Sequence, residues 1–387
     1  MQGINWAQFA IPTRIQFEND STFKVGNYVK QFGSRILLLN LKAENKNPSE
    51  LTVLKNGLTK HSDGVILYDD LTSDPTSDQI DSAAYFTKKA HADAIVAFGS
   101  IETFATAKLV SILVTNSVFA SDVINGRAKI KNPPLPLITV PVEPSLGEEL
   151  SPSFTIRDAA DGHKKYFEHE LLFPVACFYD PKVCEHLTSA SAARLGGATL
   201  AYAIESQLSP KSNPISSALA LRAIELMRRN IPQLYKDAKN EKLITSMLWS
   251  SVMISISSVS SPVGVAFSIA NALNAHDKVN FYDALSLILP HVMEYYLTAA
   301  PAQYINIARA LGEDVKDISV IEAAIKAVEG VRRLFLEVNL PTRLSEFDVK
   351  KHELEDISRL AGAFPHLENA PRMLTRNEIE SILLAAF

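Results

Sequence analysis

This chain of 387 residues contains few cysteines and carries no net positive charge. There are only two cysteines, Cys177 and Cys184, which excludes a disulfide framework and a cysteine-rich zinc site. The formal net charge is −5, so no global basic field attracts the chain to nucleic acid or to an anionic membrane surface. We therefore expect an intracellular, cytoplasmic protein that binds neither nucleic acid nor membrane, and we expect both cysteines to be structural.

A leader sequence and a membrane span are two further features that we do not expect. Residues 1–9 contain neither a basic leader nor a long apolar run, which argues against a signal peptide. Residues 245–275 carry no charged side chain and are long enough to cross a bilayer. Nine serines, Pro262 and Gly264 interrupt this segment, however. Its composition favours a pair of buried helices in a soluble core.

The bulk composition is that of an ordinary globular protein. Apolar residues make up 47% of the chain and charged residues 21%, which argues against disorder. At about 150 residues per domain, the length predicts two or three domains. A chain of this size can bury a large core, so it needs no structural metal to fold.

The first half alternates short β-branched runs with stretches of helix length. The runs predict buried strands, and the period after the third run predicts a helix over residues 103–113. Strands separated by helices indicate βαβ units and a parallel sheet, and continuous apolar runs are typical of strands covered on both faces. The four predicted strands span residues 35–40, 64–68, 94–98 and 136–141.

From about Asp180 onward, strand-like segments disappear and apolar residues recur at helical spacing. The predicted helices span residues 181–203, 215–229, 242–257, 284–299 and 302–311. We therefore expect a Rossmann-like α/β domain over residues 1–181 and an all-helical domain over 182–387. Ligands of open α/β sheets sit beyond the carboxyl ends of the strands, so the cleft between the two domains is the default site.

Several segments in this layout resemble the iron-dependent alcohol dehydrogenases and, within them, the maleylacetate reductases. The resemblance implies a dehydroquinate synthase-like fold and a nicotinamide cofactor in the first half. It also implies iron or zinc held in the helical half by a carboxylate or amide and three histidines. The segments that carry the resemblance are Asp93–Gly99 leading to Ala107-Lys108, Leu137–Pro141, Tyr179-Asp180-Pro181, Ala203-Ile204-Glu205, Asn213-Pro214, Leu289–Val292, Ala310-Leu311-Gly312 and the tail from Asn369 to Phe387.

The glycine-rich cofactor loop departs from the family pattern. Where the family has three glycines and a serine, this chain has Gly99, Ser100, Ile101 and Glu102. A carboxylate at Glu102 lies where a phosphate should dock, and two like charges so close would cost about 1–4 kcal/mol. The second phosphate loop, residues 142–149, keeps only the positions of Gly147 and Glu149. We therefore predict that the chain uses no cofactor.

The metal-ligand positions that the resemblance implies depart further. They fall on Ala198, Tyr202, Phe267 and Phe281, and the family's further histidine is Asn271 here. Apart from a phenolate in a rare role, none of these side chains is a competent ligand for iron or zinc. His276 and His291 are the nearest histidines in sequence, and neither makes a strong metal signal. We predict that the chain binds no metal.

The replacements point to an apolar pocket, which we expect to be lined by Ala198, Tyr202, Phe267, Asn271, Phe281 and Tyr282. Such a pocket suits a bulky, weakly polar small molecule; the alternative is that the aromatic rings only fill the vacated cage. The candidate catalytic residues are Tyr202 as an acid, Asn271 to polarise a carbonyl, and Glu149 as an acid or base. We expect at least two of Glu143, Glu148 and Glu149 to be solvated, and Lys108 to lie at the surface.

Three functions follow from these readings. The first is a repurposed, metal-free enzyme that promotes a non-redox step, such as cyclisation, isomerisation or dehydration, on an apolar biosynthetic intermediate. The second is a metal-free NAD(P)H-dependent reductase of the maleylacetate reductase or alcohol dehydrogenase type, with Tyr202 as the proton donor. The third is a non-catalytic scaffolding protein. The family resemblance also suggests a homodimer.

Overall fold

A computed structural model describes residues 10–41 and 48–387, which form two compact units. Ile11–His186 make an α/β unit, and Leu187–Phe387 make a unit composed of helices. The change from strand-like to helical segments that we expected near residue 181 coincides with a short 3-10 helix, Pro181–Cys184, close to the end of the first unit. Each unit is described by itself below.

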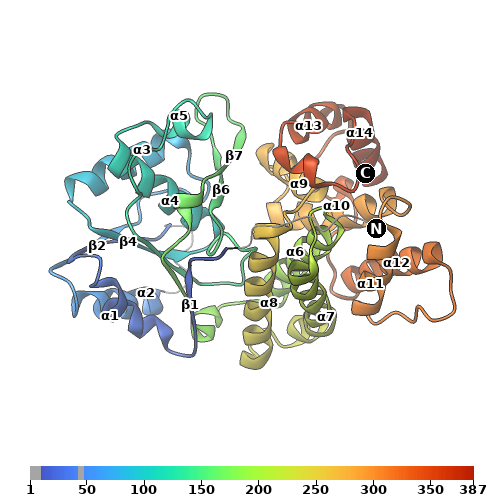
Figure 1. The fold of residues 1–387 in the computed structure, drawn as a ribbon, viewed down its shortest axis with the longest axis horizontal. Coiled ribbons are helices and arrows are strands. Elements are labelled where there is room, and N and C mark those ends of the chain that lie inside the picture. Colours follow the sequence, from blue (N-terminus) through green and yellow to red (C-terminus); the bar gives the residue numbers. More distant parts are fainter. Residues whose placement is uncertain (1–9, 42–47) are drawn as a thin grey trace. The chain divides into compact units, whose positions relative to one another are not determined.

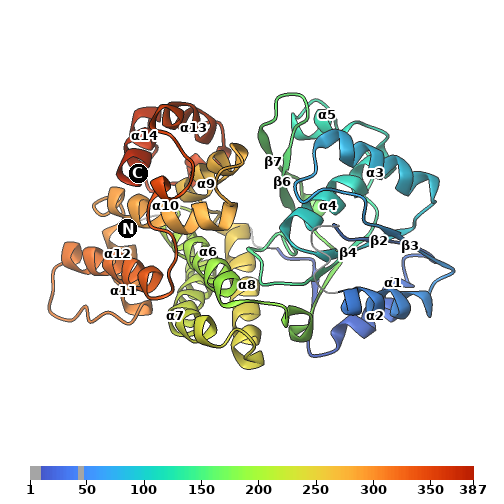
Figure 2. The ribbon, with the colours of Figure 1, turned by 180° about the vertical axis from the view of Figure 1, so that it is seen from behind.

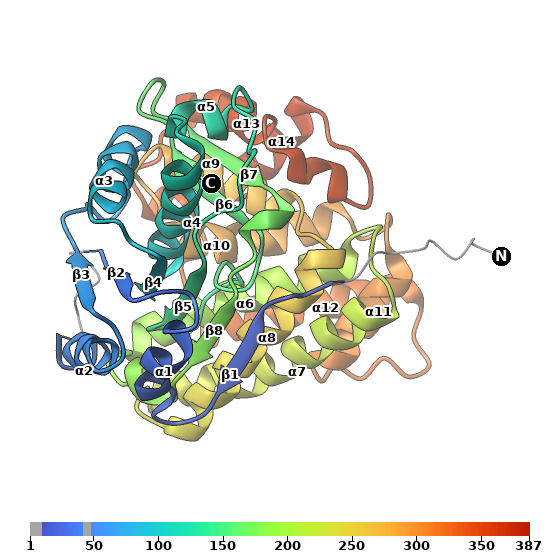
Figure 3. The same cartoon turned by 60° about the vertical axis from the view of Figure 1, so that its left-hand side comes forward.

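The α/β unit is built on a six-stranded sheet in which every pair is parallel. The strand order is β1-β8-β5-β4-β2-β3, so β1 and β3 form the two edges (Figure 3). The four strands predicted from apolar runs are all present, whereas β1 and β8 were not predicted. The bounds are β1 Arg14–Phe17, β2 Arg35–Leu39, β3 Gly64–Tyr68, β4 Ala94–Gly99, β5 Leu137–Pro141 and β8 Ala176–Tyr179.

The strands that the sequence did not reveal are short or polar. β1 and β8 have four residues each, which is too few to establish a period. Two further strands, β6 Ser153–Arg157 and β7 Lys164–Glu168, form a separate antiparallel pair. Charged and hydroxyl-bearing residues dilute their apolar signal, so only the pairing in the folded unit identifies them.

Helices cover both faces of the six-stranded sheet. α1 (Val25–Val29) and α2 (Pro48–Thr59) lie on one side, while α3, α4 and α5 lie on the other (Figure 1). Strand β2, which lies between β4 and β3, is fully buried from Ile36 to Leu39, as a strand covered on both faces must be. The helices of the second side are α3 Ser77–Lys89, α4 Ile101–Asn116 and α5 Ala120–Ile124.

The helical unit confirms the predicted change to helices, with one correction at its start. The helix expected from residue 181 begins at Ser189, because Thr188 caps it by accepting a hydrogen bond from the Ser191 N–H. Figure 2 shows α13 packed beside α9 and α14 beside α13. The bounds are α6 Ser189–Leu208, α7 Pro214–Lys236, α8 Glu241–Ser260, α9 Val265–Ala275, α10 Phe281–Tyr295, α11 Pro301–Ala310, α12 Val320–Glu337, α13 Leu354–Ala361 and α14 Arg376–Ala385.

The charge-free segment forms the expected pair of helices, α8 and α9, separated at Pro262 and Gly264. Within the described ranges, α8 is the one helix long and apolar enough to cross a membrane, judged by length and composition alone. Its serines bond across the bundle. The Ser257 hydroxyl donates to the Ser216 carbonyl and lies 2.6 Å from the Ser206 hydroxyl. These contacts tie α8 to α6 and α7, as expected of a core helix.

Candidate active site

In the α/β unit, the two loops expected to hold a cofactor lie side by side. β4 and β5 end in register, with Gly99 opposite Pro141, and the Val142 N–H donates to the Gly99 carbonyl at 3.1 Å. The chain's order along the sheet reverses between β2 and β4, which is where open α/β sheets bind ligands. At the end of β2, the Asn40 side chain donates to the Phe98 carbonyl at 2.6 Å, while its buried Oδ1 accepts no hydrogen bond from any described residue.

The amino end of α4 holds a carboxyl group of the chain itself. The Ser100 hydroxyl donates to Glu102 Oε2 at 2.8 Å, and the backbone N–H of Glu102 bonds to the same side chain. Burial raises the pKa of Glu102, and the Ser100 hydrogen bond and the Lys164 charge oppose that rise. A helix amino end is an anion site, and here Glu102 occupies it. The pyrophosphate of a dinucleotide does not fit in the same place.

The second loop is buried rather than solvated. Glu148 and Glu149 are 9% and 0% exposed, so the expectation that at least two of the three loop carboxylates are solvated is wrong. The expected surface position of Lys108 is wrong as well: it is fully buried, and its Nζ donates to the carbonyls of Glu148 and Ser153. The ammonium group holds the loop against α4, which the sequence could not show because the three segments are far apart in the chain.

Burial shifts the pKa values of Lys108 and Glu148. Desolvation lowers the pKa of Lys108 to about 8, against the opposing effect of Glu148 and Glu149. Desolvation and then the charge of Glu149 raise the pKa of Glu148 to about 7. Burial thus disfavours the charged form of both groups, while the charge of Lys108 lowers the pKa of Glu148 and that of Glu148 raises the pKa of Lys108.

Glu149, a predicted catalytic residue, belongs to the same buried network. Its carboxylate accepts a hydrogen bond from the Tyr179 hydroxyl, and its carbonyl accepts one from Thr139 at 2.8 Å. Cys177 and Cys184 are buried, and burial raises both thiol pKa values well above the ordinary range, which fits structural cysteines. Glu149 lies in the α/β unit, whereas the other two catalytic candidates lie in the helical unit.

In the helical unit, the positions implied for metal ligands converge as a cluster of aromatic rings. The ring centroids of Tyr202 on α6 and Phe267 on α9 are 5.9 Å apart, and those of Phe267 and Phe281 on α10 are 5.7 Å apart, both in edge contact. Ala198 is fully buried on α6, and Tyr282 contacts Phe281 with centroids 5.8 Å apart.

Iron or zinc does not fit this cluster. Phenylalanine rings carry no donor atom, and rings in edge contact leave no room for an ion and its ligands. Over residues 10–41 and 48–387, no group of three or more histidine, cysteine, aspartate or glutamate side chains could hold a metal ion. His276, considered above as a weak ligand candidate, instead lies 3.3 Å from the carboxylate of Asp356.

Glu205 fixes the helix that carries Phe267. α9 starts after Gly264, which has no side chain to cap it, and the Glu205 carboxylate accepts the N–H groups of Ala266 and Phe267 at 2.7 and 3.0 Å. Burial raises the pKa of Glu205 to about 7, opposed by these backbone hydrogen bonds. In the sequence, Glu205 contributed only to the family resemblance. An acidic residue within a mostly apolar helical segment could have indicated that its carboxyl group is buried.

The remaining predicted residue of the helical unit, Asn271, is buried and donates one N–H to the Phe267 carbonyl one turn back at 3.0 Å. A residue that the sequence did not indicate, His366, packs against the Phe267 ring in a tilted arrangement with centroids 4.2 Å apart. Burial lowers the pKa of His366 to about 3, so its ring is neutral. The histidine of the cluster therefore comes from the turn Pro365–Asn369, because that turn packs on α9.

Comparisons with known proteins relate both units to one family. The family described as iron-containing alcohol dehydrogenase matches residues 12–181, and the C-terminal family of Fe-containing alcohol dehydrogenases matches residues 195–387. An NAD-dependent methanol dehydrogenase of Bacillus methanolicus is 22% identical over 97% of this chain and 98% of its own length. A sulfoacetaldehyde reductase of Bilophila wadsworthia is 27% identical over 83% of this chain and 84% of its own.

Solved structures share the fold. A crystal structure of a 1,3-propanediol oxidoreductase superposes with a TM-score of 0.93 at 22% identity, covering 99% of this chain and all of its own. The sulfoacetaldehyde reductase of Bifidobacterium kashiwanohense, solved in complex with NAD⁺, gives a TM-score of 0.87 at 19% identity, with 99% of each chain covered. These likenesses confirm the predicted α/β and helical architecture.

The relatives contradict the first function that the sequence suggested. They are named as dehydrogenases and reductases, so the expectation of a non-redox cyclase, isomerase or dehydratase is wrong. That expectation came from the loss of metal ligands and phosphate loops, and such a loss does not specify a new reaction. Family matches cover both compact units of the molecule. The chain belongs to the iron-containing alcohol dehydrogenase family.

Proposed function

We propose that this chain is an NAD(P)H-dependent reductase that interconverts aldehydes or ketones and their alcohols without a bound metal. One observation carries the proposal: similarity to a protein named as an NAD-dependent alcohol oxidoreductase extends over 97% of the chain. Other relatives are named for oxidoreduction of alcohols or of an aldehyde as well.

The helical unit would contribute the proton and the apolar surroundings. Reduction of a carbonyl needs a hydride at carbon and a proton at oxygen, and in this proposal the reduced dinucleotide is the hydride source. Tyr202 has the one phenol among the positions implied for metal ligands, and a phenol can donate that proton. Phe267 and Phe281 present no charge, which favours uncharged substrates with an apolar body.

The dinucleotide cannot take the family's usual position at the amino end of α4, since Glu102 occupies it. The proposal therefore has the pyrophosphate displaced from that helix end. Asn40, whose Oδ1 is buried at the end of β2, offers an acceptor for a ligand hydroxyl at the reversal point of the sheet.

Cofactor binding and turnover test the proposal directly. Purified protein of measured metal content is titrated with NADH and with NADPH while cofactor fluorescence is followed, and then assayed with a series of uncharged aldehydes. We expect micromolar binding, metal-independent turnover, and a loss of kcat of about a hundredfold in Tyr202→Phe. Tyr235→Phe is the matched control, because Tyr235 pairs with Asn339 outside the aromatic cluster. Absence of binding and of turnover in the folded protein would refute the proposal.

A non-catalytic binding protein is the second candidate. Its supporting observation is that the chain's own side chains fill both the phosphate position at α4 and the positions implied for metal ligands. Normal cellular output with Tyr202→Phe and no dinucleotide affinity would favour it. Cytoplasmic location, a homodimer and a place among the maleylacetate reductases stay predictions under either function.

A further inference from the structure

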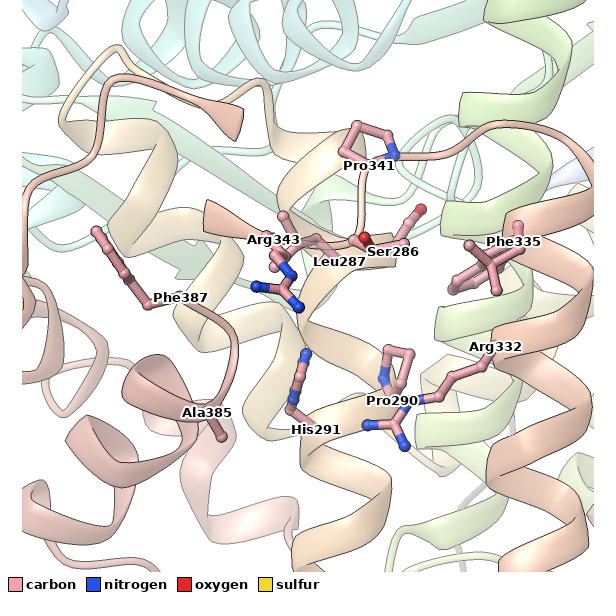
Figure 4. Close-up of a pocket in the computed structure, with 12 residues that line it drawn as sticks. Ser286, Leu287, Pro290, His291, Arg332, Phe335, Pro341, Arg343, Ala385 and Phe387 are labelled. Atoms are coloured by element: carbon pink, nitrogen blue, oxygen red, sulfur yellow. The ribbon is translucent and has the colours of Figure 1, made fainter. Parts of the chain in front are cut away.

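The helical unit contains a cavity of about 380 Å³ between α10, α12 and the segments around Pro341 and Phe387. Figure 4 shows Arg343 above the imidazole of His291, with its guanidinium directed toward that ring, and Arg332 reaching in from α12. Apolar walls come from Leu287, Pro290, Phe335 and Phe387. The volume falls within the range of pockets that take small organic ligands.

This cavity is separate from the aromatic cluster. Both use α10, but a helix turns by about 100° per residue, which places the cavity residues Ser286, Leu287 and Pro290 about 120–180° around the helix from Phe281. His291 also lies ten residues beyond Phe281, or about 15 Å along the helix axis. A ligand in the cavity would not touch Tyr202, Phe267 or Phe281.

The charged side chains that line the cavity are cationic. None of its lining residues is an aspartate or glutamate. Arg332 is paired with Glu294, whereas the Arg343 guanidinium forms no ion pair with any residue that the structure describes. Lys351 adds a further cation, since its Nζ lies 5.2 Å from the centroid of the Phe387 ring. Arg343 is therefore the cationic group that can bind an anion. Its planar guanidinium can donate two parallel N–H hydrogen bonds to a carboxylate.

His291 supplies a second polar contact. Its Nδ1 is buried and has no hydrogen-bond partner among the described residues, a state that costs free energy unless a ligand or water completes it. Burial, and then the charge of Arg332, lower the pKa of this imidazole, while Glu294 opposes that effect. The ring is therefore neutral near pH 7 and can donate or accept one hydrogen bond without competing with Arg343 for the anion.

The apolar walls require a ligand with an apolar body. Phe335 and Leu287 are each 2% exposed and form the floor, while Leu336, which is 62% exposed, lies at the rim. The apolar surface that a small inorganic anion would leave in contact with water belongs to the exposed Leu336 and the half-buried Phe387. An aromatic or aliphatic body attached to the anionic group would cover them.

From this arrangement we infer that the cavity is a binding site for a small organic carboxylate, with the carboxylate on Arg343 and the aromatic or aliphatic body against Leu336 and Phe387. The site is independent of the proposed reductase activity, because it lies on the other face of α10. It therefore suits an effector or a second ligand of the enzyme rather than the carbonyl substrate.

Calorimetric titration of the full chain with 3-phenylpropionate tests this inference. The probe has a carboxylate and an aromatic body; 3-phenylpropionamide lacks the charge, and acetate lacks the body. We expect submillimolar binding of 3-phenylpropionate and binding at least about tenfold weaker for each of the other two. No dinucleotide is present in this experiment, so its result is independent of whether the reductase proposal holds.

Variants locate the binding. Arg343→Gln should weaken 3-phenylpropionate binding about tenfold or more, and His291→Leu should weaken it less. Arg333→Gln is the matched control, since Arg333 follows Arg332 on α12 but pairs with Glu313 outside the cavity. Arg343 is exposed, so its replacement should leave the fold intact, which circular dichroism checks. Equal affinity for acid and amide, equal affinity of the two arginine variants, or no binding at millimolar probe would each overturn the inference.

Discussion

At the amino end of α4, the position where the family resemblance implies a phosphate holds the carboxyl group of Glu102, and Lys108 and Glu148 form a buried polar network next to it. In the helical unit, the positions implied for metal ligands hold Phe267, Phe281 and their aromatic neighbours. Charged and polar groups thus fill the position implied for the phosphate, and apolar rings fill the positions implied for the metal ligands.

The difference follows from what each site is made of. A phosphate site at a helix end consists of backbone N–H groups, which no substitution removes, so something must still satisfy them. Glu102 now does so. A metal site consists of side chains alone, and substituting them removes the whole demand for a polar partner. An apolar filling is therefore available to the helical unit but not to the α4 end.

The largest expected effect is that of Phe267→Ala, which tests whether the helical site is filled. Phe267 is buried and contacts Tyr202, Phe281 and His366, so the change should lower the free energy of unfolding by about 3–5 kcal/mol. Urea unfolding followed by circular dichroism measures it. Phe119→Ala, at a ring that is 68% exposed, is the control and should cost little. A loss below about 1 kcal/mol would mean that the rings border open space.

Lys108→Met tests the polar half of the comparison. The change removes the buried ammonium that holds the loop carbonyls of Glu148 and Ser153 and leaves two buried carboxyl groups near an apolar side chain. We expect a loss of about 3 kcal/mol in urea unfolding. Lys55→Met, at an exposed position of α2, should change the stability by less than about 0.5 kcal/mol. An equally stable Lys108→Met protein would show that the network is dispensable.

Glu205→Gln addresses the acid that fixes α9. Because the folded-state pKa of Glu205, about 7, lies above its ordinary value of 4.5, the stability it contributes is full below about pH 4.5 and falls as the pH rises toward 7. The corresponding loss is at most about 3 kcal/mol. Glutamine does not titrate, so unfolding free energies at about pH 5 and about pH 7 should differ less in the variant than in the parent protein. Equal differences would contradict a raised pKa.

The smallest expected effect is on dinucleotide affinity. Glu102→Gln removes the negative charge at the amino end of α4 while keeping the side-chain shape, and we expect the affinity for NADH to change by less than about twofold, because the proposal places the pyrophosphate away from this helix end. Fluorescence titration measures it, with Glu225→Gln, at an exposed ion pair of α7, as the control. Tenfold tighter binding would instead place the pyrophosphate at this helix end and contradict the displaced position.

The sequence by itself determined the architecture. Apolar runs predicted strands β2, β3, β4 and β5, and helical spacing predicted the second unit, because burial imposes both patterns on every residue of an element. It also determined that Phe267 and Phe281 cannot hold a metal, since ligand chemistry depends on residue type alone. The short strands β1 and β8 were not predicted because four residues show no period.

Only the tertiary structure decided which polar residues are buried together. Lys108 donates a hydrogen bond to the carbonyl of Glu148, which is 40 residues away in the chain. The His366 ring contacts the Phe267 ring from a distant turn. No local pattern marks such pairs, because the same residue types are common on solvated surfaces. The structure likewise brought Arg343, His291 and Phe335 to one cavity from three separate segments. Residue types set what each position can do, whereas long-range packing sets which positions act together.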